Sequence, residues 1–229
     1  MPQFTKDSSI SDFQKFQTEV YGLSDDRNYS LSDLLVNQQR FTMRAIKGIR
    51  KGDTEKLKLN VCISLSWLMA VANRLHIHVE ETVWQRFPER CSYCGEKPCV
   101  CKKIKQRKRG HFPQVSEEKK PVTLSQFQEM FSQIYPPASR SLSDAGVHLA
   151  EEMGEVSEAI HNFLGEHKDS RFQAIPCEIA DYMSCVFGAM NSANLSLADA
   201  LANTFKNNCN VCHQAPCTCS FPFIADFES

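Results

Sequence analysis

Two pairs of acidic residues have a spacing that can build a metal site. Glu152 and Glu155 are three residues apart, and so are Glu178 and Asp181. Residues at positions i and i+3 share one helix face, so each pair presents two carboxylates side by side. Each pair borders an apolar stripe, where gathered carboxylates repel one another and are costly to desolvate. A divalent cation removes that cost, and oxygen ligands favour Mg²⁺ or Mn²⁺. The alternative is two unrelated pairs of acids at the borders of amphipathic helices.

Helical periodicity and capping residues predict an all-α protein. Ser11 is the expected cap of the first helix, and Thr123 and Gln126 have the spacing of a capping box. The predicted helices span residues 11–21, 32–49, 53–76, 79–87, 123–135, 143–164, 175–194 and 196–208. The acid pairs fall on the sixth and seventh of these helices, which must pack together if the carboxylates are to meet.

The chain contains an internal repeat, and only one copy carries the acids. Matching residues lie 114 positions apart in the first two helices of each copy and 118 apart further on. At these offsets the first copy has neutral residues where the second has its four acids: Gln38, Phe41, Asn60 and Ile63. The first copy therefore cannot build the carboxylate cluster, and we expect it to have a structural role.

A cluster of four cysteines follows each copy with the same spacing, C-x2-C-x4-C-x-C. Thiolates in close pairs around Gly and Pro turns suit tetrahedral Zn²⁺. One structural zinc per copy is the simplest count, because four protein ligands leave no open coordination position. Ligands shared between the clusters, a His213 ligand and an iron–sulfur cluster are alternatives. The eight cysteines are Cys91, Cys94, Cys99, Cys101, Cys209, Cys212, Cys217 and Cys219.

The acidic motif resembles that of the MazG-like, all-α nucleoside triphosphate pyrophosphohydrolases, whose hallmark is ExxE followed by ExxD. The resemblance covers residues 123–208. It implies Mg²⁺-dependent cleavage of a nucleoside triphosphate to the monophosphate and pyrophosphate. By motif position, Glu152, Glu155, Glu178 and Asp181 would bind Mg²⁺, and Glu151 or Glu152 would handle the attacking water. Lys206 and Asn207 occupy the place of a nucleotide-contacting element on the family's fourth helix.

Family members work as oligomers, so the resemblance also implies that the two copies form an internal pseudo-dimer and that a homo-oligomer can form. The expected segments are a degenerate helical unit with its cysteine cluster (1–101), a basic linker (102–122), a catalytic unit with its cluster (123–219) and a tail (220–229). Residues 102–109 contain six Lys or Arg, which fits a solvated linker or a phosphate- or nucleic-acid-contacting arm.

Composition limits the function classes further. The net charge of −1 gives the whole molecule no polyanion-binding signature, which makes nucleic acid an unlikely partner. The longest apolar run is too short to span a bilayer, and the N-terminus lacks a hydrophobic signal core. We therefore expect a cytoplasmic protein with no membrane partner and a nucleotide substrate. The alternative function is a non-catalytic, zinc-stabilised adaptor that binds nucleic acid or nucleotides.

Overall fold

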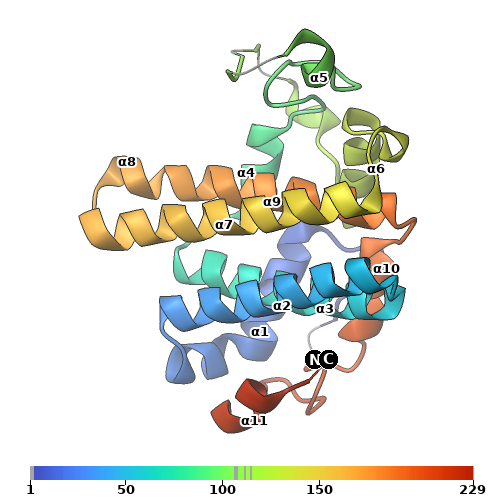
Figure 1. The fold of residues 1–229 in the computed structure, drawn as a ribbon. Helices are drawn as coiled ribbons and strands as arrows, with labels where there is room; N and C mark the ends of the chain where they lie inside the picture. Colours follow the sequence, from blue (N-terminus) through green and yellow to red (C-terminus); the bar gives the residue numbers. More distant parts are fainter. Residues whose placement is uncertain (1–2, 106–107, 111, 114, 229) are drawn as a thin grey trace. The chain divides into compact units, whose positions relative to one another are not determined.

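The computed structural model describes residues 3–105, 108–110, 112–113 and 115–228, and every element in this part of the chain is helical (Figure 1). None of its helices is long and apolar enough to cross a membrane. Residues 106–107, 111 and 114 of the predicted linker lie outside the described residues. The principal helices are α1 (Ile10–Asn28), α2 (Leu31–Lys51), α3 (Thr54–Arg74), α4 (Val79–Arg86), α6 (Leu124–Ile134), α7 (Leu142–Glu166), α9 (Ala174–Ser192) and α10 (Leu197–Thr204).

Short helical turns join these helices, and the sequence did not indicate them. They are α5 (Cys101–Ile104), η1 (Glu117–Lys119), η2 (Pro137–Ser139), α8 (Asp169–Phe172) and α11 (Phe221–Asp226). With four to six residues at most, the α-helical turns are too short to show a 3.6-residue period.

The helix starts follow side-chain capping. Ser9, not Ser11, is the N-cap of α1: its Oγ accepts the Asp12 N–H at 2.9 Å, and Asp12 Oδ2 accepts the Ser9 N–H at 2.8 Å. The prediction of Ser11 as the cap is wrong because the Ser9–Asp12 pair satisfies two helix-terminal N–H groups at once. Thr123 and Gln126 form the expected capping box at α6.

The helices form two compact units, Met1–Val79 with Ser196–Ser229, and Glu80–Leu195. Each unit thus combines the first three long helices of one sequence repeat with the fourth helix and the cysteine cluster of the other. These bounds differ from the predicted segments 1–101 and 123–219. A fourth helix of only eight residues cannot bury its apolar face alone, and α10 of the second repeat packs on α3 of the first.

The same hydrogen bonds recur inside each unit. In the first unit Gln14 Nε2 donates to Asn73 Oδ1 at 2.8 Å. In the second, Gln128 Nε2 donates to Asn191 Oδ1 at 2.9 Å. The cysteine clusters also dock alike. The Cys217 N–H donates to the Val20 carbonyl in the first unit and the Cys99 N–H to the Ile134 carbonyl in the second.

In the second unit α7 and α9 run side by side, and α6 packs on α9 (Figure 1). Phe87 follows α4 and is 2% exposed; its ring lies 5.2 Å from that of Phe131. Phe205 has the matching place in the first unit, where it contacts Phe13 at 5.6 Å. These rings anchor the fourth helix of one repeat in the core built by the other.

Phe87→Ala should reduce the free energy of unfolding by about 3–5 kcal/mol, because it leaves a large cavity in the core of the second unit. Hydrogen exchange should then rise in α6 and α9, which belong to the other repeat. Phe205→Ala should act instead on α1 and α3. Faster hydrogen exchange confined to each residue's own repeat would contradict the packing of each fourth helix in the core of the other repeat.

Candidate metal centre and adjoining cavity

The packed pair α7 and α9 brings three of the four predicted acids together. Glu152 on α7 and Glu178 and Asp181 on α9 each offer a carboxylate oxygen, and these oxygens lie within 4.8 Å of one another. Asp181 is 6% exposed, and both glutamates are half-buried. The i and i+3 spacing on α9 places Glu178 and Asp181 on one face, as the sequence predicts.

The two other candidate acids on α7 lie outside this group. Glu155 is exposed, but it lines the adjoining cavity and lies close enough to Glu178 to raise the pKa of that carboxyl. Glu151 is exposed and is not among the residues that line the cavity. Metal ligation by Glu155 and a role for Glu151 with water stay predictions.

Two carboxylate oxygens in the group are buried without a hydrogen-bond partner: Glu152 Oε2 and Glu178 Oε2. Burial and the neighbouring carboxylates raise the pKa of Glu152 to about 8 and that of Glu178 to about 7. An unpartnered buried carboxylate is costly unless a cation or a proton neutralises it. Three carboxylates within ligating reach of one point therefore fit a hard divalent cation such as Mg²⁺.

Two arginines bind the third acid. Arg86, at the end of α4, bonds Asp181 through Nε–Oδ1 at 3.1 Å and Nη2–Oδ2 at 2.6 Å. Arg109 Nη2 lies 2.7 Å from the same Oδ2. Burial raises the pKa of Asp181, and the charge and hydrogen bonds of Arg86 oppose that rise.

The sequence does not single out these arginines, because Arg86 looks like an ordinary residue at a helix end and Arg109 like one in a charged linker. A signal was present in the repeat. At the 118-residue offset Arg86 matches Thr204, and its partner Asp181 matches Ile63. An arginine and an acid that are absent together from one copy indicate an ion pair in the other.

A cavity of about 570 Å³ adjoins the acids within the second unit. This lies in the usual range of about 300–1,000 Å³ for small-molecule sites. Its walls include acids from α7 and α9, aromatic side chains, the first cysteine cluster and basic residues. The charged or titratable side chains other than cysteine and tyrosine are Lys102, Lys103, Arg109, Arg140, His148, Glu152, Glu155 and Asp181.

The corresponding positions of the first unit are neutral and tightly packed. Gln38 donates to Thr42 at 3.1 Å, and the hydroxyls of Thr42 and Ser64 are 2.7 Å apart. The cavity there measures only about 50 Å³ and is lined by Trp67 and Phe227 among others. At the positions that match Glu155 and Asp181 the first unit has Phe41 and Ile63, and these two residues line this small cavity.

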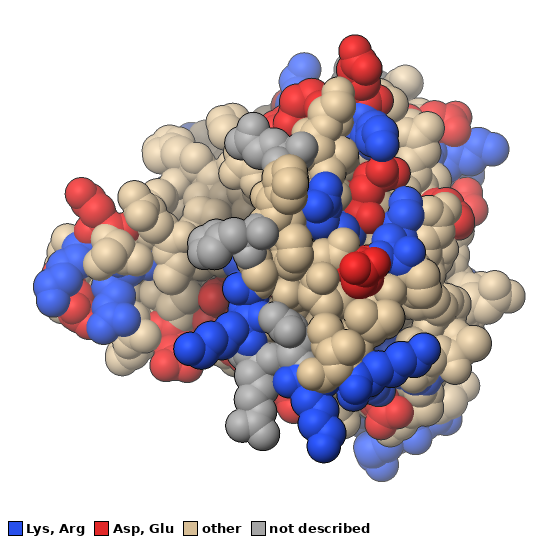
Figure 2. Space-filling view, turned by 90° about the horizontal axis from the view of Figure 1, so that it is seen from above, with Lys and Arg blue, Asp and Glu red and all other residues tan. Residues whose placement is uncertain are grey.

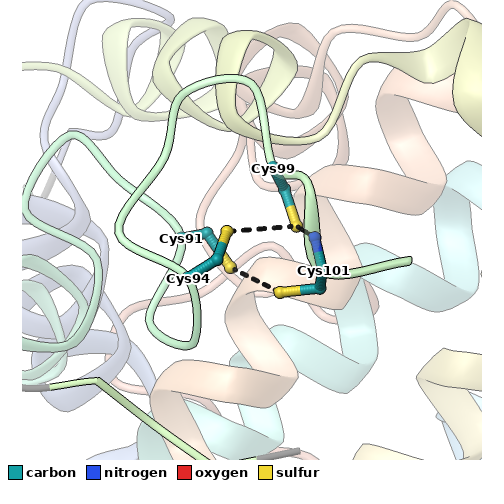
Figure 3. A group of neighbouring side chains, drawn as sticks. All are labelled: Cys91, Cys94, Cys99 and Cys101. Carbon is teal, nitrogen blue, oxygen red and sulfur yellow. Dashed lines mark hydrogen bonds between the residues drawn. The ribbon is translucent and has the colours of Figure 1, made fainter. Parts of the chain in front are cut away.

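The first cysteine cluster has the geometry of a four-sulfur metal site (Figure 3). Cys91 Sγ lies 3.6 Å from Cys101 Sγ, and Cys94 Sγ lies 3.9 Å from Cys99 Sγ. Four sulfurs at about 2.3 Å from a tetrahedral Zn²⁺ are about 3.8 Å apart. The four thiols are free and point toward one another, so this cluster can bind a zinc-type metal.

The second cluster has the same arrangement in the first unit. The sulfur of Cys209 lies 3.9 Å from that of Cys219 and 3.5 Å from that of Cys217. His213 is exposed with φ 58° and matches Gly95, with φ 75°, so it occupies a left-handed turn. Each group of four sulfurs is complete within its own unit and includes no histidine.

The predicted nucleotide-contacting residues and the acids belong to different units. Lys206 and Asn207 are exposed and follow α10 in the first unit, whereas the acid group belongs to the second. In the second unit the positions that match them are Pro88 and Glu89. Their contact with a nucleotide stays a prediction.

No protein-family model matches this chain, and comparisons with curated proteins and with solved structures also gave no match.

The pKa values predict how stability depends on pH without Mg²⁺. Between about pH 5 and 8 the folded protein holds protons on Glu152 and Glu178 that the unfolded chain releases. The free energy of unfolding should therefore fall as pH rises through this range. Added Mg²⁺ should raise the melting temperature more at pH 8 than at pH 6, because fewer protons compete with it.

The matched control is the double variant Glu152→Gln/Glu178→Gln, measured by the same thermal melts. It should lose most of the pH dependence and of the Mg²⁺ effect. An equal Mg²⁺ effect in the variant would contradict a cation at these acids.

Elemental analysis should find about two Zn per chain, since each unit has a complete four-sulfur group. Cys94→Ser and Cys212→Ser should each lose about one Zn, and the double variant about two. Loss of both metals in a single variant would instead indicate shared ligation.

Proposed function

We propose that the second unit hydrolyses a nucleoside triphosphate to the monophosphate and pyrophosphate with Mg²⁺ bound by Glu152, Glu178 and Asp181. The observation that carries the proposal is a group of three carboxylates, two with unpartnered buried oxygens, beside a cavity large enough for a nucleotide. The motif's resemblance to the MazG-like pyrophosphohydrolases supports this substrate class.

The residues around the cavity have complementary roles in this reaction. The bound Mg²⁺ would neutralise phosphate charge and make phosphorus easier to attack. Glu152, Glu178 and Asp181 would hold it, with Glu155 as a further ligand at the exposed edge. Glu152 lines the cavity and can also orient a water or accept its proton.

The first unit would support the catalytic one without chemistry of its own. The first sequence repeat contributes α4 and the first cysteine cluster, which belong to the catalytic second unit. In the dimers of the resembled family, neighbouring chains complete each site. Here the two copies of one chain would form the corresponding pseudo-dimer.

Pyrophosphate release should be measured over a panel of nucleoside triphosphates with and without Mg²⁺. Glu152→Gln and Asp181→Asn should each lower kcat/KM by at least about a hundredfold, because each removes a charged metal ligand. Glu158→Gln is the control: Glu158 is exposed on the same helix and does not line the cavity. Full activity in either of the first two variants would contradict the assignment.

The alternative, a non-catalytic adaptor, makes a different prediction. It requires tight binding of DNA or RNA with no hydrolysis of any nucleotide. Basic and acidic side chains are interspersed on the face shown in Figure 2, and Arg109 of the basic linker is paired with Asp181. Both observations favour the enzyme.

A further inference from the structure

The cavity beside the acids is lined by two arginines that each have one buried nitrogen without a hydrogen-bond partner. Arg109 Nη1 and Arg140 Nε are buried and have no partner. Both side chains line the cavity of about 570 Å³. A guanidinium N–H that is removed from water without an acceptor is costly, and a phosphate oxygen is a strong acceptor for it.

Arg109 is fixed in place by two neighbours. Its Nη2 lies 2.7 Å from Asp181 Oδ2, and its guanidinium carbon lies 4.6 Å from the centre of the Tyr93 ring. The stacking and the ion pair both restrict a side chain that would otherwise be flexible. A cation bound by Asp181 would weaken the ion pair and free the Nη2 donor beside the metal.

Arg140 occupies space that only a glycine leaves open. It lies just before α7, and its Nη2 is 1.5 Å from the place where a Cβ on Gly188 would stand. The guanidinium therefore packs directly against the backbone of α9, the helix that carries two of the acids. In the first unit the position that matches Gly188 is Ala70, so a guanidinium could not pack there in the same way.

The two units differ in charges of both signs. The unit without the carboxylates also lacks the arginine at Thr204 and the glycine at Ala70. If these arginines served only to neutralise the acids, their N–H groups would donate to the carboxylates. Arg109 Nη1 and Arg140 Nε instead have no hydrogen-bond acceptor. An anion that binds beside the metal accounts for both features.

We propose that Arg109 and Arg140 form a phosphate-binding wall of the cavity and hold the polyphosphate of the substrate beside the carboxylate-bound cation. Arg109 brings the end of the basic linker into the site, exchanging part of its bond with Asp181 for a phosphate oxygen. The identity of the substrate as a nucleoside triphosphate rests on the proposed function, but recognition of a polyphosphate does not.

Inorganic tripolyphosphate with Mg²⁺ is the probe, and isothermal titration of the full chain measures its Kd. Arg109→Gln and Arg140→Gln should each weaken binding by at least about tenfold, the loss expected for one charge-assisted hydrogen bond. Arg109→Lys should recover part of it. Arg171→Gln is the matched control, since Arg171 is exposed, pairs with Glu166 and does not line the cavity.

Gly188→Ala should weaken binding as Arg140→Gln does, because the added methyl displaces the guanidinium. The double variant Arg140→Gln/Gly188→Ala should be no weaker than the single variants, and melting curves check that each variant folds. No binding by the wild type, or affinities of Arg109→Gln and Arg140→Gln within twofold of it, would overturn the proposal. Arginine-dependent binding without hydrolysis of any nucleotide would instead overturn the proposed function and leave this inference standing.

Discussion

The packing of α7 against α9 is the constraint on which the second unit depends, because it forces three carboxylates together. Glu152, Glu178 and Asp181 approach within 4.8 Å because α7 and α9 bury the apolar residues beside them. The helix packing is thus obtained at an electrostatic cost, which is visible in the raised pKa values of Glu152 and Glu178. Arg86 and Arg109 form ion pairs with Asp181, and the charge of Arg86 opposes only part of the pKa rise at the two glutamates. A divalent cation at the three carboxylates would remove the remaining cost, which is the basis of the proposed metal site.

The first unit shows the same helical scaffold without the costly group of carboxylates. In the first unit the same scaffold holds Gln38, Thr42 and Ser64 in a neutral hydrogen-bonded network, and the cavity lined by Phe41 and Ile63 measures only about 50 Å³. That unit needs no cation and no phosphate. The cysteine clusters are alike in both units, which agrees with a structural role for these potential metal sites and separates them from the acidic site.

Much of this could be predicted from the sequence because it is local. Capping residues and apolar periodicity gave the long helices, and i, i+3 spacing gave the acid pairs. The packing of each fourth helix with the other repeat could not be predicted, because α4 and α10 have the same apolar pattern and each could cover either core. Arg109 and Arg140 could not be predicted for a related reason: both lie in connecting segments between the long helices, and such arginines acquire a function only through long-range contacts. Comparison of the repeats could have identified Arg86 and Gly188.

The central claim is that the carboxylate group of the second unit binds a divalent cation. Titration of the zinc-loaded protein with Mn²⁺, followed by electron paramagnetic resonance, measures this directly because free and bound Mn²⁺ have different signals. One saturable site that competes with Mg²⁺ and disappears in Glu178→Gln is the predicted result. Unchanged Mn²⁺ binding in Glu178→Gln, or no saturable binding in the wild type, would contradict the account.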